Sequence, residues 1–164
     1  MRTRAAATLL MAVLVLGVLA QPATTAPNPV VASATGSGHM VRAGFFRTFT
    51  FAAQKYADGT STGQLELRSP QFDVVIHLRI DCLLVDGNEA HMSGLITFTS
   101  NPDEAFVGEL NRVAVRDNGE GPGAEPDLVS GIPANPRNEN PDTCEDRSLT
   151  PDRVVQSGNV RVQG

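Results

Sequence analysis

The chain has 164 residues, a length that fits one domain of ordinary size. It carries 18 acidic against 13 basic residues, for a net charge of −5, and this acidic excess disfavours nucleic acid as a partner. With no tryptophan and a single tyrosine, a sugar-stacking cleft of the kind used by glycosidases and lectins is poorly supported.

The N-terminus has the pattern of a secretory signal peptide. Arg2 and Arg4 provide the positive charge, and an apolar run from Ala5 to Ala20 follows them. The run has about 16 residues, whereas a membrane-spanning helix needs roughly 20. We therefore predict a signal peptide over residues 1–20, a secreted mature protein, and no membrane anchor in the mature chain.

The next segment, residues 21–38, is rich in Pro, Ala, Thr, Ser and Gly. Such a composition is typical of a flexible or extended linker. We therefore expect the linker to end at residue 38 and a single β-domain to occupy residues 39–164.

The first predicted hairpin joins two runs of alternating hydrophobicity around Asp58-Gly59. If the loop has three residues and ends in a left-handed glycine, Phe51 pairs with Leu65 and Phe49 pairs with Leu67. This register places the apolar side chains of both strands on one face.

The second predicted hairpin joins Phe72–Val85 to a run that starts near Ala90, with Asp86-Gly87 at the turn. A two-residue Asp-Gly turn would set apolar side chains opposite polar ones, because a one-residue slip exchanges the faces of a strand. A three-residue loop instead pairs Cys82 with Ala90 and buries one coherent face. We therefore predict the three-residue loop, with Cys82 and Leu84 on the core side.

These patterns predict an all-β fold, since no segment after residue 38 shows a helical period. The expected architecture is an antiparallel β-sandwich or small β-barrel of about 7–8 strands. Exactly two cysteines are present, Cys82 and Cys144, and in an exported protein a disulfide is the economical interpretation. Closing a loop of about 60 residues would stabilise the domain by about 4 kcal/mol.

His77 and His91 form the most obvious candidate for metal binding or proton transfer. In the predicted register His91 lies opposite Asp81, about 13 Å along the strand from His77 at roughly 3.3 Å per residue. Ligand bonds near 2 Å cannot bridge that separation easily. Isolated surface histidines are the favoured interpretation.

A second candidate is the loop that begins with Asp117-Asn118-Gly119 and continues to Asp127. Oxygen side chains on a glycine-rich loop can hold calcium, so Asp117, Asn118 and Asp127 are the predicted ligands and calcium is the one cofactor considered. A long turn needs the same residues, because asparagine and glycine accept positive φ, and this interpretation is favoured.

Nucleophilic catalysis has no recognisable motif in this chain. The favoured function is therefore a non-catalytic extracellular binding or structural module, whose partner the sequence leaves unknown. The alternative is a small-barrel enzyme, of isomerase or cyclase type, acting on an apolar small molecule. The enzyme hypothesis predicts that charged side chains such as Asp73, Arg79 or Asp81 point into a cavity, whereas the binding module predicts that they face solvent.

The order of several short motifs resembles a widespread family of exported bacterial β-domains without an established activity. The motifs are Thr48-Phe49-Thr50-Phe51-Ala52-Ala53, Asp58-Gly59, Gly63-Gln64-Leu65, Cys82, Gly87-Asn88-Glu89-Ala90, Ser93-Gly94, the stretch from Val113 to Gly123 with Asp117-Asn118-Gly119-Glu120, Cys144, and Ser157-Gly158-Asn159-Val160-Arg161-Val162. The resemblance implies an antiparallel β-domain that ends with the Gly-Asn strand. It transfers no catalytic residue, because the family has none known.

Overall fold

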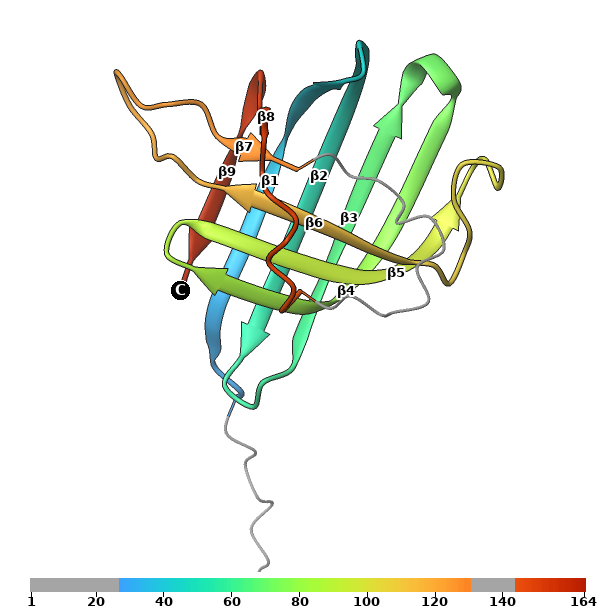
Figure 1. The fold of residues 1–164 in the computed structure, drawn as a ribbon. Helices are drawn as coiled ribbons and strands as arrows, with labels where there is room; N and C mark the ends of the chain where they lie inside the picture. The colour runs from blue at the N-terminus through green and yellow to red at the C-terminus, as the bar shows by residue number, and fades with distance from the viewer. Residues whose placement is uncertain (1–26, 131–143) are drawn as a thin grey trace, which may run out of the picture.

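The computed structural model describes residues 27–130 and 144–164. Over these residues the chain forms one antiparallel sheet of nine strands (Figure 1). The strands are β1 (Val30–Arg42), β2 (Phe45–Tyr56), β3 (Ser61–Ser69), β4 (Val74–Asp86), β5 (Glu89–Thr99), β6 (Leu110–Arg116), β7 (Leu128–Val129), β8 (Arg153–Val154) and β9 (Ser157–Gln163), with a short 3-10 turn, η1 (Pro70–Phe72), before β4. The predicted signal peptide, residues 1–20, lies outside the described residues.

The sheet has the order β8-β7-β6-β5-β4-β3-β2-β1-β9 and curls into a half-barrel. As Figure 1 shows, β4, β5 and β6 cross in front of β1, β2 and β3, so the inner faces of the two halves meet. The prediction of an all-β antiparallel fold is confirmed, and the single curled sheet corresponds to its barrel form. The described residues contain no helix long and apolar enough to cross a membrane.

The first hairpin has the predicted register. Phe49 pairs with Leu67 and Phe51 with Leu65 across β2 and β3. The loop ends with Gly59 at a φ of +87°, a conformation that glycine adopts without steric cost. Burial of one apolar face was therefore enough to select this turn.

The second hairpin differs from the prediction. Asp86 pairs with Glu89, so Gly87 and Asn88 form a two-residue loop. A bulge between Ile80 and Cys82 then shifts the register and restores apolar pairing further along the ladder. The extra residue exchanges the faces of β4, so Leu83, at 1% exposure, is buried in the core. The predicted placement of Cys82 and Leu84 on the core side is wrong for this reason.

The expected linker is wrong over residues 30–38, which belong to β1. This strand lies inside the sheet, between β2 and β9. Its small residues have a steric role: a Cβ at Gly36 would lie 2.7 Å from a ring carbon of Phe51, and one at Gly38 would lie 2.6 Å from the Ser157 carbonyl oxygen. The small residues of this segment suggested a flexible linker. In the sheet, their small size instead leaves space for an aromatic ring of β2 and for the backbone of β9.

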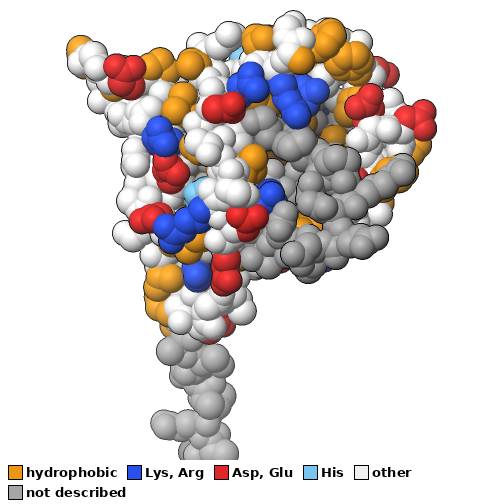
Figure 2. Space-filling view, in the orientation of Figure 1, with side chains coloured by type: hydrophobic (Ala, Val, Ile, Leu, Met, Phe, Trp, Pro, Cys, Tyr) orange, Lys and Arg blue, Asp and Glu red, His pale blue; other side chains and the backbone are white. Residues whose placement is uncertain are grey.

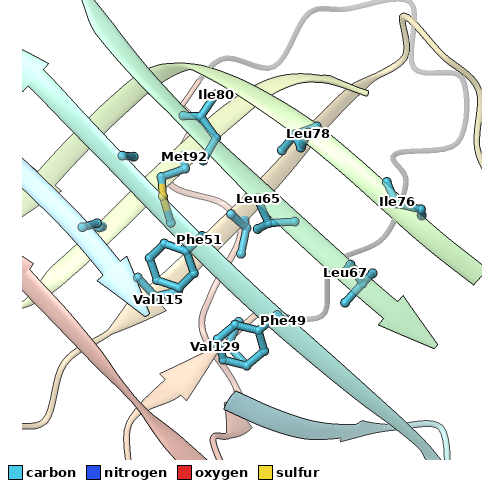
Figure 3. Packing of buried hydrophobic residues seen from close by; sticks show 14 of the residues in the cluster. Phe49, Phe51, Leu65, Leu67, Ile76, Leu78, Ile80, Met92, Val115 and Val129 are labelled. Carbon is cyan, nitrogen blue, oxygen red and sulfur yellow. The ribbon is translucent and has the colours of Figure 1, made fainter. Parts of the chain in front are cut away.

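The core lies between the two halves of the curled sheet (Figure 3). The rings of Phe49 and Phe51 stack with centroids 6.1 Å apart. They point toward Val115 and Val129 from the opposite half, as Figure 3 shows. Packing between the halves holds the curl.

A disulfide joins Cys82 to Cys144, with Cα atoms 5.7 Å apart, which confirms the predicted pair. Because Cys82 lies on the outer face of β4, the bond holds the chain after Cys144 across the outside of the sheet (Figure 1). Asp146 reinforces this position by accepting a hydrogen bond from Arg112 at 2.8 Å. Because the segment after Cys144 covers this part of the outer face, His91 and Ser93 are buried although they point away from the core.

Candidate functional site

The predicted calcium ligands lie where the two ends of the curled sheet approach each other. Asp127 accepts hydrogen bonds from the backbone amides of Asn118 at 2.9 Å and Val160 at 2.7 Å. Asp117 accepts from Gly119 at 2.8 Å and from Val162 of β9 at 3.0 Å. All four carboxylate oxygens therefore accept backbone amides, and two of these amides belong to the outer edge of β9.

This arrangement gives the two aspartates a structural role. An exposed strand edge leaves amide groups without partners, and the carboxylates satisfy two of them on β9. The third predicted ligand, Asn118, donates its side-chain amide to the Pro126 carbonyl at 2.6 Å. Within residues 27–130 and 144–164, no group of three or more His, Cys, Asp or Glu side chains is placed to hold a metal ion. Calcium binding stays a prediction.

The two candidate histidines are farther apart than the predicted register placed them. His91 lies opposite Leu84, and the offset from His77 is roughly 23 Å along the strand at about 3.3 Å per residue. His77 contacts Glu66 at 3.2 Å, whereas His91 is buried, at 5% exposure. Burial lowers the pKa of His91.

A shallow groove of about 400 Å³ follows the outer face of β2 to β5. Its central carboxylate, Glu66, contacts Arg68 at 2.6 Å on one side and His77 on the other. Hydrogen bonding to Arg68 lowers the pKa of Glu66. Within this groove Glu66 therefore pairs with Arg68 and His77, while Arg79 lies exposed at its border.

A second cavity, of about 390 Å³, lies at one end of the half-barrel, and we call it the mouth cavity. Its lining includes Arg42, Phe45, Arg47, Ser69, Phe72 and Val74, with Leu67 and Ile76 toward the core. Phe45 and Phe72 form an edge-on aromatic pair with centroids 4.7 Å apart. Both rings remain exposed, at 40% and 43%, at an end of the molecule where hydrophobic side chains gather near Lys or Arg in Figure 2.

Two polar groups of the mouth cavity have no hydrogen-bond partner among the described residues: Arg47 Nε and Ser69 Oγ. The β2–β3 ladder pairs Thr48 with Arg68, so Arg47 and Ser69 occupy the next opposed positions on the inner face. Opposed residues on neighbouring strands have Cβ atoms about 4.5–5.5 Å apart. The cavity lining therefore takes two neighbouring residues whose polar atoms, Nε and Oγ, are nearly inaccessible to water and unpaired.

The charges at the mouth are two arginines and one glutamate. Burial, followed by the nearby charge of Arg42, lowers the pKa of Arg47, while Glu104 opposes the shift. Arginine still keeps its charge at neutral pH. The described lining therefore combines apolar walls with two arginines and one glutamate.

Sequence analysis missed the mouth cavity, although β2 carried a signal for it. Inward-facing positions of this strand hold Phe45, Phe49, Phe51 and Ala53, and Arg47 occupies the one between the first two phenylalanines. A charged residue on the core-facing side of a strand is expected only with a partner or a function. The partner strand and its Ser69 could be placed only by the register.

The residues singled out by the enzyme hypothesis lie elsewhere. Asp73, Arg79 and Asp81 are all exposed. Arg79 borders the outer groove and not the interior. Each described carboxylate with a shifted pKa has it lowered, as for Glu66 beside Arg68, which keeps the group ionised. A general acid of raised pKa is therefore not found among the described carboxylates whose shift is resolved.

Comparison with protein-family models, with curated proteins and with solved structures found no match to this chain. The resemblance to exported bacterial β-domains therefore stays an expectation. The geometry of the described residues is the basis for the function proposed below.

Proposed function

We propose that the chain is an exported, non-catalytic β-domain that binds a small, largely apolar molecule in the mouth cavity. The observation that carries the proposal is the exposed pair Phe45 and Phe72 beside a cavity whose floor is continuous with the core. Ligand sites of this size, about 300–1,000 Å³, typically combine apolar walls with a few polar groups. Export is supported by the N-terminal pattern and is compatible with the disulfide.

A non-catalytic role is favoured over the small-barrel enzyme because of where charge is placed. The enzyme needs an acid or base within reach of a bound substrate. Asp73 and Asp81 are exposed, and Glu104, the carboxylate in the described lining of the mouth cavity, is exposed and interacts with the charge of Arg47. The cavity offers hydrogen-bond donors and apolar surface, which suffice for binding.

The test uses N-phenyl-naphthylamine, a neutral apolar dye that fluoresces when it leaves water. The purified domain should increase its fluorescence with a saturable isotherm of one site. Phe72→Ser should weaken binding by about ten-fold, because removing a large apolar contact costs about 1.5–3 kcal/mol. The variant keeps the fold, since the side chain is 43% exposed.

The matched control is Phe98→Ser, because Phe98 is 46% exposed but lies on the outer face beside His77. This variant should bind the dye as the wild type does. Equal losses for Phe72→Ser and Phe98→Ser would mean that the dye adheres to any exposed ring. Either that result or absence of saturable binding would overturn the proposed function.

A further inference from the structure

We propose that the mouth cavity selects an amphiphilic oxyanion, with its negatively charged head against Arg47 and Ser69. The inference rests on the proposed function and adds the chemistry of the ligand's head. The apolar body would lie along Phe45 and Phe72, and the head would be a carboxylate, a phosphate or a sulfonate.

The first argument is the pair of unpaired polar groups. Ser69 is 3% exposed, and its hydroxyl has no hydrogen-bond partner among the described residues. Nε of Arg47 is also buried and also lacks a hydrogen-bond partner there. A buried polar group without a hydrogen bond is costly, so a ligand that supplies the missing partner binds more strongly. Arg47 Nε–H is a donor, and the Ser69 hydroxyl can donate, so an acceptor matches both.

The second argument is the sign of the charge. Arg42 and Arg47 both line the cavity, and Glu104 is the one carboxylate among its described lining residues. A positively charged head would meet two arginines in a partly desolvated site, which is unfavourable. A negatively charged oxygen pair matches the planar guanidinium in both charge and geometry.

The third argument is that the described lining of the outer groove holds none of the buried polar atoms that lack a hydrogen bond. Its central carboxylate, Glu66, would repel an anion and already pairs with Arg68 and His77. In the mouth cavity, Nε of Arg47 and the Ser69 hydroxyl both lack a hydrogen-bond partner among the described residues. The mouth cavity therefore offers an anion two buried donors that the described lining of the outer groove lacks.

The experiment compares two dyes that share one aromatic skeleton. Anilinonaphthalene sulfonate carries an anionic head, and N-phenyl-naphthylamine lacks it. We expect the wild-type domain to bind the sulfonate at least ten-fold more tightly, because a charge-assisted hydrogen bond adds about one to two orders of magnitude in affinity. Arg47→Gln should remove this preference, so that the two dyes bind with nearly equal affinity.

Two further variants keep the test decisive if Arg47→Gln fails to fold. Glu104→Gln removes the opposing charge on an exposed loop and should tighten binding of the sulfonate alone. Ser69→Ala should reduce the ratio of the sulfonate's affinity to that of the neutral dye. The control is Arg68→Gln, which removes a positive charge from the outer face, 56% exposed, and should change neither affinity.

Competition identifies the class of head group. Decanoate and decyl phosphate are compared with decanol for displacement of the sulfonate dye, and the more effective anion assigns the head as carboxylate or phosphate. Equal affinity for both dyes in wild type and in Glu104→Gln would overturn this inference while the proposed function stands. Failure of both dyes to bind would overturn the proposed function as well.

Discussion

Replacement of Asp127 by alanine tests whether carboxylates hold the ends of the curled sheet together. Asp127 is 8% exposed, and Val160, whose amide it accepts at 2.7 Å, is 1% exposed. A hydrogen bond to a charged group contributes about 1.5–3 kcal/mol, and the buried Val160 amide would lose its partner. Water replaces part of the second bond, to Asn118, which is half-buried. We expect Asp127→Ala to lower the free energy of unfolding by about 3 kcal/mol.

The measurement is urea unfolding followed by circular dichroism, together with hydrogen exchange at the Val160 amide. A loss of this size lowers the midpoint of thermal unfolding by roughly 10 °C for a domain of this length. Exchange at Val160 should become faster than at amides within the β2–β3 ladder. Asp127→Asn should fall between wild type and alanine, because the amide keeps one acceptor oxygen.

Glu120 provides the matched control. It also reaches β9, accepting from Arg161 at 2.9 Å and from Asn159 at 3.0 Å, but its side chain is 62% exposed. Exposed ion pairs contribute little, so Glu120→Ala should leave the unfolding curve unchanged within error. If Asp127→Ala and Glu120→Ala behave alike and Val160 stays protected, the role assigned to Asp127 is refuted.

Three other predictions concern the disulfide, His91 and calcium. Replacing Cys82 and Cys144 by serine should lower the free energy of unfolding by about 4 kcal/mol, and mass spectrometry should find no free thiol in the wild type; free thiols would contradict the bond. Because the folded-state pKa of His91 lies below its ordinary 6.5, stability should fall as pH drops below that value, and His91→Gln should remove this slope; an unchanged slope would contradict the assignment. A calcium chelator should leave the melting midpoint unchanged, since the carboxylate oxygens of Asp117 and Asp127 already accept hydrogen bonds from backbone amides. A lower midpoint would indicate that calcium binds to the folded domain.

Local patterns predicted the strands of the two hairpins, β2 to β5, because alternation and turn chemistry act over a few residues. The register of β2 on β3 followed from placing Phe49 and Phe51 opposite Leu67 and Leu65. The same reasoning failed in the second hairpin because a bulge beside Asp81 adds one residue and exchanges the faces of β4. A bulge leaves little trace in hydrophobic alternation when the residues on both sides are apolar.

The candidate sites depended even more on contacts between distant segments. Asp117 and Asp127 showed as oxygen-rich loop residues in the sequence, and only the approach of β9 revealed their partners. The mouth cavity shows the same limit. Arg47 on the inward side of β2 was visible in the alternation, but Ser69 comes from a different strand and Phe72 from the turn η1.

The sequence by itself determined the all-β class, the Cys82–Cys144 disulfide and the first hairpin, because each depends on residue type and short-range geometry. Only the tertiary structure decided that residues 30–38 belong to a strand paired on both sides and that the sheet curls into a half-barrel. These features depend on which strands meet, and a sequence pattern specifies the face of a strand without naming its neighbour. The mouth cavity depends on the pairing of β1, β2 and β3, which places Arg42, Arg47 and Ser69 at the same end of the sheet.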